Sequence, residues 1–355
     1  MYISKIKLYN YRNYIEQEIN LDKGVNVFYG LNGEGKTNIL EAVYLNAIGK
    51  SFRTSKDKEL INFNKELAKT EIEYVTKKRE GKINITISDK KDIILNGIKV
   101  NRLSEFLGNI NIVLFNPDDI LILKKGPGER RRFLDVMISQ LRPKYVYYLS
   151  QYKKILEQRN IYLRQENKNY DLLDIWDEKL VTTGKEIQNY RNEFIEKIKE
   201  KINNTHKNIT DEKEEIKIKY LSNLNENKLK EARNEDIERG YTSIGVHRDD
   251  FLVYINGKMV NQYGSQGQNR TAILSLKLSE LEIVYEEIGE YPILLLDDFM
   301  SELDGNRRKK LLENIRETQV LITCTEKIEI DKFPFKMFNI KDGELKECIY
   351  TSEIM

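Results

Sequence analysis

The chain has 355 residues, of which 59 are Lys or Arg and 57 are Asp or Glu, so its formal net charge is only +2. This balance excludes binding of nucleic acid through overall charge, and any polyanion must meet a local basic patch. The two cysteines exclude a disulfide framework and indicate a reducing compartment. The polar N-terminus is unlike a signal peptide, and no apolar run approaches the ~20 residues of a membrane span, so we expect a soluble, cytoplasmic protein.

The first 120 residues carry strand signals on both sides of a glycine-rich loop. Apolar or alternating segments predict strands at residues 3–10, 15–21 and 25–30. The spacing of residues 36–49 predicts a helix that ends at Gly49. Further short strands, one of them folded about an Asn96–Gly97 turn, are expected at residues 70–76, 83–88, 92–100 and 110–115.

The middle of the chain changes character and is helix-periodic and strongly charged. Residues 130–141, 145–165 and 172–202 each predict a long helix, with a break near residues 166–171. This pattern predicts an antiparallel helical arm. The arm is too short for the sustained heptads of a long coiled coil.

Strand and helix signals alternate again in the last third of the chain. We expect strands at residues 251–263, with a turn at Asn256–Gly257, and then a helix that opens near Ser265. A strand at 292–298, a helix from about residue 304, a strand at 320–325 and a hairpin through Asp342–Gly343 follow. Strands alternating with helices at both ends predict one α/β domain, residues 1–120 and 240–355, interrupted by a helical lobe at 121–239.

The segment "GLNGEGKT" matches the P-loop pattern and lies between a predicted strand and a predicted helix. Its glycines let consecutive N–H groups face a phosphate, while Lys36 can reach the β and γ phosphates and Thr37 can ligate Mg²⁺. The alternative is a chance glycine turn. The nucleotide-binding residues expected here are Gly30, Leu31, Asn32, Gly33, Glu34, Gly35, Lys36, Thr37 and Asn38.

Two acids end the apolar strand "ILLLDD". A buried parallel strand has this composition, and ligands of open α/β sheets bind at the carboxyl ends of such strands. We therefore assign Asp297 to Mg²⁺ and Asp298 to the attacking water. The alternative is a strand that leaves the sheet through polar capping residues.

The loop "YGSQGQ" places Ser265, Gln266 and Gly267 at a helix start, where unsatisfied N–H groups and the positive end of the dipole favour an anion. The order of P-loop, Ser-x-Gly-Gln helix start and acidic strand resembles the ATP-binding-cassette class. That resemblance implies that Ser265 of one subunit caps the γ-phosphate held by another. It also makes "SELD" a dimer-contacting loop with Ser301 and Asp304, unless these residues only cap the next helix.

Several segments together resemble the RecF family of bacterial recombination mediators. They are "NYRNY", the P-loop with the helix after it, "GPGERRRFLD", "GVHRDDF", "YGSQGQNRT" and "LLLDDFMSELD", in the family's order across nearly the whole chain. The resemblance implies an α/β, ABC-type P-loop ATPase head assembled from both chain ends, with an inserted α-helical lobe. It further implies ATP and Mg²⁺ as cofactors and ATP-driven homodimerisation. The implied partners are single- and double-stranded DNA at gaps or junctions, and RecR in the loading of RecA.

Two departures from general cassette ATPases predict slow hydrolysis, with stimulation by DNA. Asp298 stands where glutamate is common, and Thr323 and Thr325 stand where a switch histidine would fall. Arg12 matches the family's early arginine. It either touches nucleotide or is an exposed arginine at a strand end.

A basic cluster begins one of the middle helices, where the helix dipole mildly disfavours cations. Either it contacts DNA phosphates or it is a solvated or lobe-packing face. The segment "GVHRDDF" is better explained as an internal ion-pair node of Arg248, Asp249 and Asp250 than as a catalytic group. The candidate DNA-binding residues are Lys124, Lys125, Arg130, Arg131 and Arg132.

Two other functions are compatible with the motifs. The chain could be the cytosolic motor subunit of a membrane transporter, although the long helical insertion and the triple-arginine helix start argue against it. It could also be an ATP-gated DNA clamp that scarcely hydrolyses ATP, which differs from a mediator only in its rate of turnover.

Overall fold

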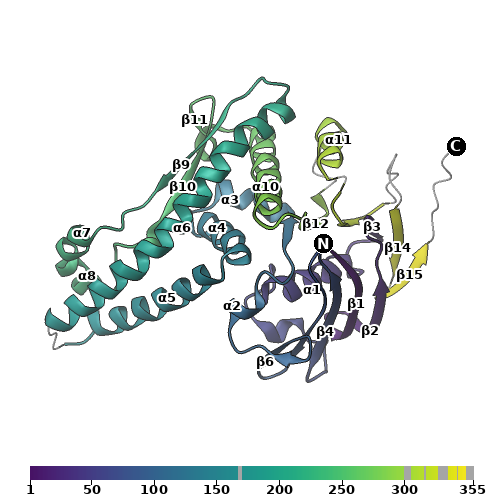
Figure 1. Cartoon of the computed structure of the whole chain (residues 1–355), viewed down its shortest axis with the longest axis horizontal. Coiled ribbons are helices and arrows are strands. Elements are labelled where there is room, and N and C mark those ends of the chain that lie inside the picture. Colours follow the sequence, from purple (N-terminus) through teal and green to yellow (C-terminus); the bar gives the residue numbers. More distant parts are fainter. Residues whose placement is uncertain (167–169, 300–304, 316, 327–334, 342, 349–355) are drawn as a thin grey trace. The chain divides into compact units, whose positions relative to one another are not determined.

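The computed structural model describes residues 1–166, 170–299, 305–315, 317–326, 335–341 and 343–348. The chain forms two compact units (Figure 1). The first combines Met1–Asp119 with Glu280–Met355, and the second is Ile120–Ser279. The first unit is therefore assembled from both ends of the chain, as predicted. No helix in the described part of the chain has the length and hydrophobicity needed to span a bilayer.

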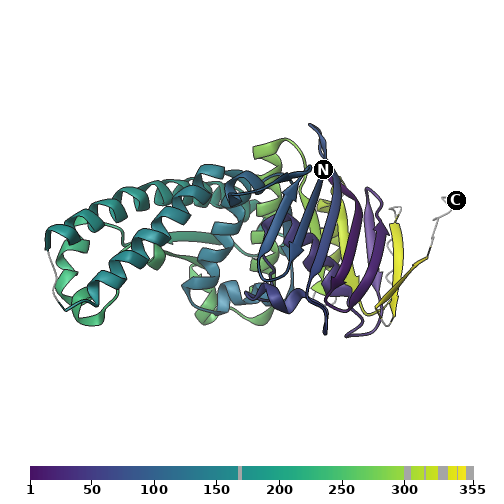
Figure 2. The ribbon, with the colours of Figure 1, turned by 90° about the horizontal axis from the view of Figure 1, so that it is seen from below.

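One sheet of the first unit is antiparallel, with the strand order β2-β1-β4-β5-β6-β7. Its strands lie side by side in purple and blue in Figure 2. Buried and partly exposed residues alternate along β4 and β5, as expected of strands with one face on a core. Asn96 and Gly97 form the predicted turn, with φ of 50° and 83°. The strands are β1 (Tyr2–Tyr11), β2 (Tyr14–Asn20), β4 (Ala68–Val75), β5 (Glu80–Ile87), β6 (Lys91–Leu95) and β7 (Ile98–Lys99).

The other sheet has the order β15-β14-β3-β13-β12-β8, and all of its neighbouring strands are parallel except β15 against β14. Every residue of β3, β8, β12 and β13 is buried. Parallel strands covered on both faces have such continuous apolar runs. The strands are β3 (Val25–Tyr29), β8 (Ile112–Phe115), β12 (Ile293–Asp297), β13 (Val320–Cys324), β14 (Phe335–Lys341) and β15 (Glu344–Cys348).

Helix α1 (Lys36–Ile48) contacts strands of both sheets, and most of its side chains are buried. It ends at Gly49, whose φ is 77° and whose N–H donates to the carbonyl of Leu45, so the predicted stop is confirmed. The helix is the core of this unit and fixes the loop that precedes it. The unit also contains α2 (Leu103–Phe106), α11 (Gly305–Asn314) and the 3-10 turns Asp57–Leu60 and Pro117–Asp119.

The second unit is built on the predicted arm. Helices α5 (Pro143–Leu163) and α6 (Tyr170–Thr210) pack against each other on either side of the expected break (Figure 1). Both α5 and α4 (Pro127–Leu141) start with proline, whose missing N–H costs nothing in the first turn. The remaining helices are α3 (Ile120–Lys124), α7 (Glu226–Glu231), α8 (Arg233–Arg239), α9 (Val260–Tyr263) and α10 (Gln266–Ile288), the last continuing into the first unit.

Besides the predicted helices, the second unit contains a three-stranded sheet that we did not assign to the lobe. Strand β10 (Asp250–Ile255) pairs on one side with β9 (Ile216–Leu221) and on the other with the short β11 (Lys258–Met259). The pairing of β10 with β9 brings residues 240–279 into this unit, whereas we assigned them to the head. Residues 260–263, expected to continue a strand, form α9.

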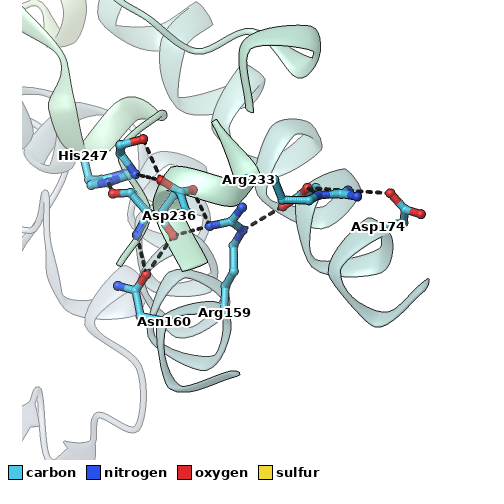
Figure 3. A network of polar contacts seen from close by, with 9 residues as sticks. Arg159, Asn160, Asp174, Arg233, Asp236 and His247 are labelled. Atoms are coloured by element: carbon cyan, nitrogen blue, oxygen red, sulfur yellow. Dashed lines mark hydrogen bonds and ion pairs between the residues drawn. The ribbon is translucent and has the colours of Figure 1, made fainter. Parts of the chain in front are cut away.

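A buried ion-pair network connects three helices of the second unit (Figure 3). Arg159 on α5 is fully buried and donates through Nε to Asp177 on α6 at 2.7 Å and through Nη1 to Asp236 on α8 at 2.8 Å. Its Nη1 also donates to the hydroxyl of Thr242. A charge buried this deeply requires partners, and the partners fix how α5, α6 and α8 pack.

Candidate nucleotide-binding site

The P-loop connects β3 to α1 in the first unit, as predicted. A Cβ atom on Gly30 would lie 2.3 Å from the carbonyl oxygen of Ile340. A Cβ atom on Gly35, where φ is 106°, would lie 2.4 Å from the side chain of Asn13. Glycine is therefore required at both ends of the loop, because neither the space nor the backbone accommodates a side chain.

Lys36 lies over the loop that precedes it. Its Nζ donates to the carbonyl oxygens of Gly30 at 2.7 Å and Leu31 at 2.8 Å, and the residue is only 4% exposed. These contacts hold the ammonium group among the backbone atoms of the loop. A positive charge and the first N–H groups of α1 are thus gathered at one place, as an anion site requires.

Thr37, Asp297 and Thr323 meet at the carboxyl ends of β12 and β13. Asp297 is the last residue of β12 and pairs in register with Thr323 of β13. The hydroxyls of Thr37 and Thr323 each donate to Oδ1 of Asp297 at 2.8 Å. The Thr323 hydroxyl in turn accepts the N–H of Asp298 at 2.9 Å. Thr323, which we expected only to stand in place of a switch histidine, therefore positions both acids.

The two acids differ in environment. Burial raises the pKa of Asp297, the negative charge of Asp298 raises it further, and the two threonine hydroxyls oppose this. Asp298 has a φ of 49°, which is uncommon for a residue with a side chain. Such a backbone conformation costs on the order of 1 kcal/mol and is concentrated at functional sites.

Arg12 is held against α1, so the reading as an exposed strand-end arginine was wrong. Its Nε and Nη2 donate to the two carboxylate oxygens of Glu41 at 2.8 and 2.7 Å, and Glu41 is fully buried on α1. The Arg12 Nη1 donates to the carbonyl of Glu59. A bidentate pair of this kind fixes the guanidinium beside the P-loop helix. Contact between Arg12 and nucleotide stays a prediction.

The residues around Arg12 also hold the P-loop, a role that sequence reasoning missed. The Asn13 amide donates to the carbonyl of Glu34 at 2.9 Å and accepts from the amide of Asn38 at 2.7 Å. The Tyr14 hydroxyl donates to the carbonyl of Gly35 at 3.1 Å. The segment "NYRNY" is a strand end whose side chains reach the loop, which no local sequence signal reveals.

The loop around Ser265 begins α10, as predicted, but it lies in the second unit and not in the head to which we assigned it. The N–H of Gln268 donates to the Ser265 hydroxyl at 3.2 Å, and the N–H of Ser265 donates to the Gln268 side-chain oxygen at 3.0 Å. This is a reciprocal capping box. The N–H groups of Gln266 and Gly267 belong to the first helical turn, where intrahelical partners are lacking. Ser301 and Asp304 lie outside the described residues.

The structure corrects part of the predicted DNA-binding cluster. Arg130 is 5% exposed, and its guanidinium pairs with Asp250 through Nε and Nη2 and with two backbone carbonyls through Nη1. Arg131 donates to the carbonyl of Asp249. Arg130 therefore serves packing within the unit, and its assignment to DNA was wrong. Lys124, Lys125 and Arg132 are exposed.

Asp249 and Asp250 do form the expected ion pairs, but their partners are Arg191 and Arg130, not Arg248. The carboxylate of Asp249 accepts from Arg191 at 2.8 Å, from the Tyr220 hydroxyl and from the Ser222 hydroxyl. Arg248 lies over the ring of Tyr241 at 5.4 Å from its centre. The acids of "GVHRDDF" thus join β9, β10 and α6, which accounts for them without catalysis.

Comparison with known proteins identifies the family. Residues 2–341 match the model of the RecF/RecN/SMC N terminal domain. The chain is 44% identical over 367 residues to the DNA replication and repair protein RecF of Clostridium tetani, covering 98% of this chain and 100% of that protein. It is 45% identical over 363 residues to RecF of Clostridium botulinum ATCC 19397, with the same coverage. The chain belongs to the RecF family.

Solved structures agree with this membership. The chain is similar to a solved structure of the recombination mediator protein RecF with ATP, from the RecFOR pathway. The TM-score is 0.92 and the identity is 39%, with 98% of both chains covered. The same protein with ATPrS gives a TM-score of 0.91. An Smc head bound to the C-winged helix domain of ScpA, at 17% identity, has a TM-score of 0.62 and shares the fold. The predicted ABC-type ATPase fold of the RecF and SMC proteins is confirmed, and family membership argues against the transporter alternative.

Proposed function

We propose that the chain is an ATP-dependent DNA-binding recombination mediator of DNA replication and repair, which dimerises on ATP. The observation that carries this proposal is the hydrogen bond between Thr37 and Asp297, next in sequence to a lysine whose ammonium group is held in the P-loop. A P-loop threonine, an acid at the end of the adjacent strand and a loop lysine are the parts that hold a nucleoside triphosphate with its metal ion.

The residues present fit ATP. The glycines at positions 30 and 35 leave a loop whose backbone approaches its neighbours more closely than any side chain would allow. Lys36 and the N–H groups at the start of α1 would bind the phosphates. ATP is also the ligand named for the RecF structure that this chain resembles over nearly its whole length.

The Thr37 hydroxyl and the Asp297 carboxylate would hold Mg²⁺, which would neutralise the negative charge that develops during phosphoryl transfer. Oxygen ligands of this kind suit Mg²⁺. Asp298 would orient the attacking water, with its backbone N–H fixed by Thr323. Hydrolysis would be slow, because an aspartate is one methylene shorter than the usual glutamate and positioning is most of the catalysis.

The loop at Ser265 would complete the site of a second copy. Each copy would offer its exposed Ser265 and the first N–H groups of α10 to the γ-phosphate held by the other. Two copies related by a twofold axis would form two equal sites. ATP would then act as the bridge between subunits, and hydrolysis would release them.

DNA and protein partners follow from the family. The relatives are named DNA replication and repair proteins, and the similar structure is named a recombination mediator of the RecFOR pathway. We infer that the dimer binds DNA at single-strand gaps or junctions and cooperates with RecR in loading RecA. Because the net charge is +2, DNA would meet a local surface that includes Lys124, Lys125 and Arg132.

Sizing the protein by sedimentation, with and without ATP and DNA, tests the proposal. Lys36→Ala should lose ATP binding and remain monomeric. Ser265→Arg should bind ATP as the wild type does and also remain monomeric, because only the other subunit's nucleotide meets this loop. Normal ATP-dependent dimerisation of Ser265→Arg would show that the composite site is wrong. A phosphate-release assay then separates a slow mediator from a clamp with negligible turnover.

A further inference from the structure

The loop at Ser265 is connected by side chains to the far end of helix α6. The Nε2 of Gln268 donates to Oε1 of Glu214 at 2.7 Å. The other carboxylate oxygen of Glu214 lies 3.3 Å from Nε2 of His206, a fully buried residue near the end of α6. All of these residues belong to the second unit.

Gln268 can satisfy both of its neighbours in only one orientation. Its side-chain oxygen accepts the N–H of Ser265 at 3.0 Å, while its side-chain nitrogen faces the carboxylate of Glu214. Exchanging the oxygen and nitrogen would set two donors against each other at Ser265 and two acceptors against each other at Glu214. Glu214 therefore fixes the rotamer that closes the capping box over Ser265.

Glu214 itself is held in place by a defined turn. Asp211 and Glu212 have φ of 52° and 62°, which reverses the chain after α6. The N–H of Glu215 donates to the side chain of Asn256, and the N–H of Ile216 donates to the side chain of Asn203 on α6. The backbone on the C-terminal side of Glu214 is thus fixed both to α6 and to the β10 turn.

A second contact, between fully buried residues, joins α6 itself to α10. Nδ1 of His206 lies 2.9 Å from the hydroxyl of Ser275 on α10, and that hydroxyl donates to the carbonyl of Thr271. Thr271 in turn donates through its hydroxyl to the carbonyl of Gly267. Helix α6 therefore contacts α10 at its third turn, and the turn that follows α6 contacts α10 at its first turn.

We propose that Glu214 is a positioning residue for the loop at Ser265. Through Glu214, the arm helix α6 controls how Ser265 engages the ATP of a second copy. This inference rests on the composite site proposed above. A charge-assisted hydrogen bond holds Gln268, and a fixed Gln268 keeps the Ser265 hydroxyl and the first N–H groups of α10 in one geometry. Any ligand or strain that moves the end of α6 would be transmitted to this loop.

The test compares Glu214→Ala with the adjacent control Glu215→Ala. Glu215 is an exposed residue. Within the described part of the chain, its side chain pairs only with the exposed Lys217. We expect Glu214→Ala to weaken dimerisation in a slowly hydrolysed ATP analogue by about tenfold or more. Binding of the analogue to the monomer should be unchanged, because Lys36 and Thr37 are intact. Glu215→Ala should behave as the wild type.

Two further measurements separate positioning from a general loss of structure. Hydrogen exchange of nucleotide-free protein should be faster at the amides of Gln268 and Asn269 in Glu214→Ala and unchanged in Glu215→Ala. Glu214→Gln keeps an oxygen that can accept from Gln268, so it should restore most of the dimerisation. In a double-mutant cycle, adding Glu214→Ala to Gln268→Ala should not weaken dimerisation any further.

The outcomes are distinguishable from those of the composite site itself. If Ser265→Arg is monomeric while Glu214→Ala dimerises as tightly as the wild type, Glu214 has no positioning role. The same conclusion follows if Glu214→Gln fails as badly as Glu214→Ala, or if the two substitutions at positions 214 and 268 are additive. If Ser265→Arg dimerises normally, the proposal of a composite site is contradicted instead.

Discussion

The Thr37 hydroxyl donates a hydrogen bond of 2.8 Å to the Asp297 carboxylate, although 260 positions separate the two residues in the sequence. Thr37 lies in the first turn of α1, and Asp297 ends strand β12. The contact exists because α1 packs on the parallel sheet that contains β12. It brings a hydroxyl and a carboxylate to one point at the carboxyl edge of that sheet.

This geometry gives the two neighbouring acids different expected phenotypes. Asp298→Asn should bind Mg²⁺-ATP and dimerise but hydrolyse ATP about a hundredfold more slowly, since the group that orients the water is lost. It should also hold DNA longer than the wild type after ATP is withdrawn. Asp297→Asn should additionally weaken the binding of Mg²⁺-ATP. Phosphate release and DNA dissociation are the measurements, and wild-type hydrolysis by Asp298→Asn would move the role to another carboxylate.

DNA binding should depend on the exposed members of the basic cluster. Replacing Lys124, Lys125 and Arg132 together by alanine should weaken DNA binding to a similar extent for all sequences. On duplex DNA, the slope of log affinity against log salt should flatten by about 0.9 for each phosphate that the variant no longer neutralises. Arg130→Ala is the contrasting variant, because it removes the partner of Asp250 and should lower stability. An unchanged slope in the triple variant would place the DNA surface elsewhere on the protein.

The buried network at Arg159 should matter more for stability than an exposed ion pair of the same unit. Arg159→Ala leaves the buried carboxylates of Asp177 and Asp236 without their shared guanidinium, so we expect a loss of about 3–5 kcal/mol in the free energy of unfolding. The control is Arg239→Ala, since Arg239 and Glu235 form an exposed pair worth about 0–1 kcal/mol. Urea unfolding followed by circular dichroism measures both. Equal losses in the two variants would contradict the proposed importance of burial.

His247 should make the second unit sensitive to acid. Burial lowers its pKa to about 4, and its ring is held by the Tyr152 hydroxyl at Nδ1 and the carbonyl of Thr242 at Nε2. Between its unfolded pKa of about 6.5 and pH 4 the unfolded chain binds the extra proton, so stability falls as pH falls. The slope from this residue is at most about 1.4 kcal/mol per pH unit. Unfolding midpoints of wild type and His247→Asn across this range isolate the contribution, and parallel curves would exclude it.

Local patterns allowed much of the site to be predicted. The P-loop, the acids after β12 and the start of α10 at Ser265 depend on residues close together in the sequence, so composition and spacing identify them. The residues that support them could not be found in this way. Asn13 and Tyr14 reach the P-loop from a strand end, and Glu214 reaches Gln268 from 54 positions away.

The sequence by itself determined the α/β class, the nucleotide loop and the helical arm, because each follows from residue types at fixed local spacing. Only the tertiary structure decided which side chains meet. It buried Arg130 in an ion pair with Asp250 and paired Arg12 with Glu41. It moved residues 240–279 into the second unit, since β10 pairs with β9. Charge is visible in a sequence, but whether a charge faces solvent or a partner depends on long-range packing, which no local pattern contains.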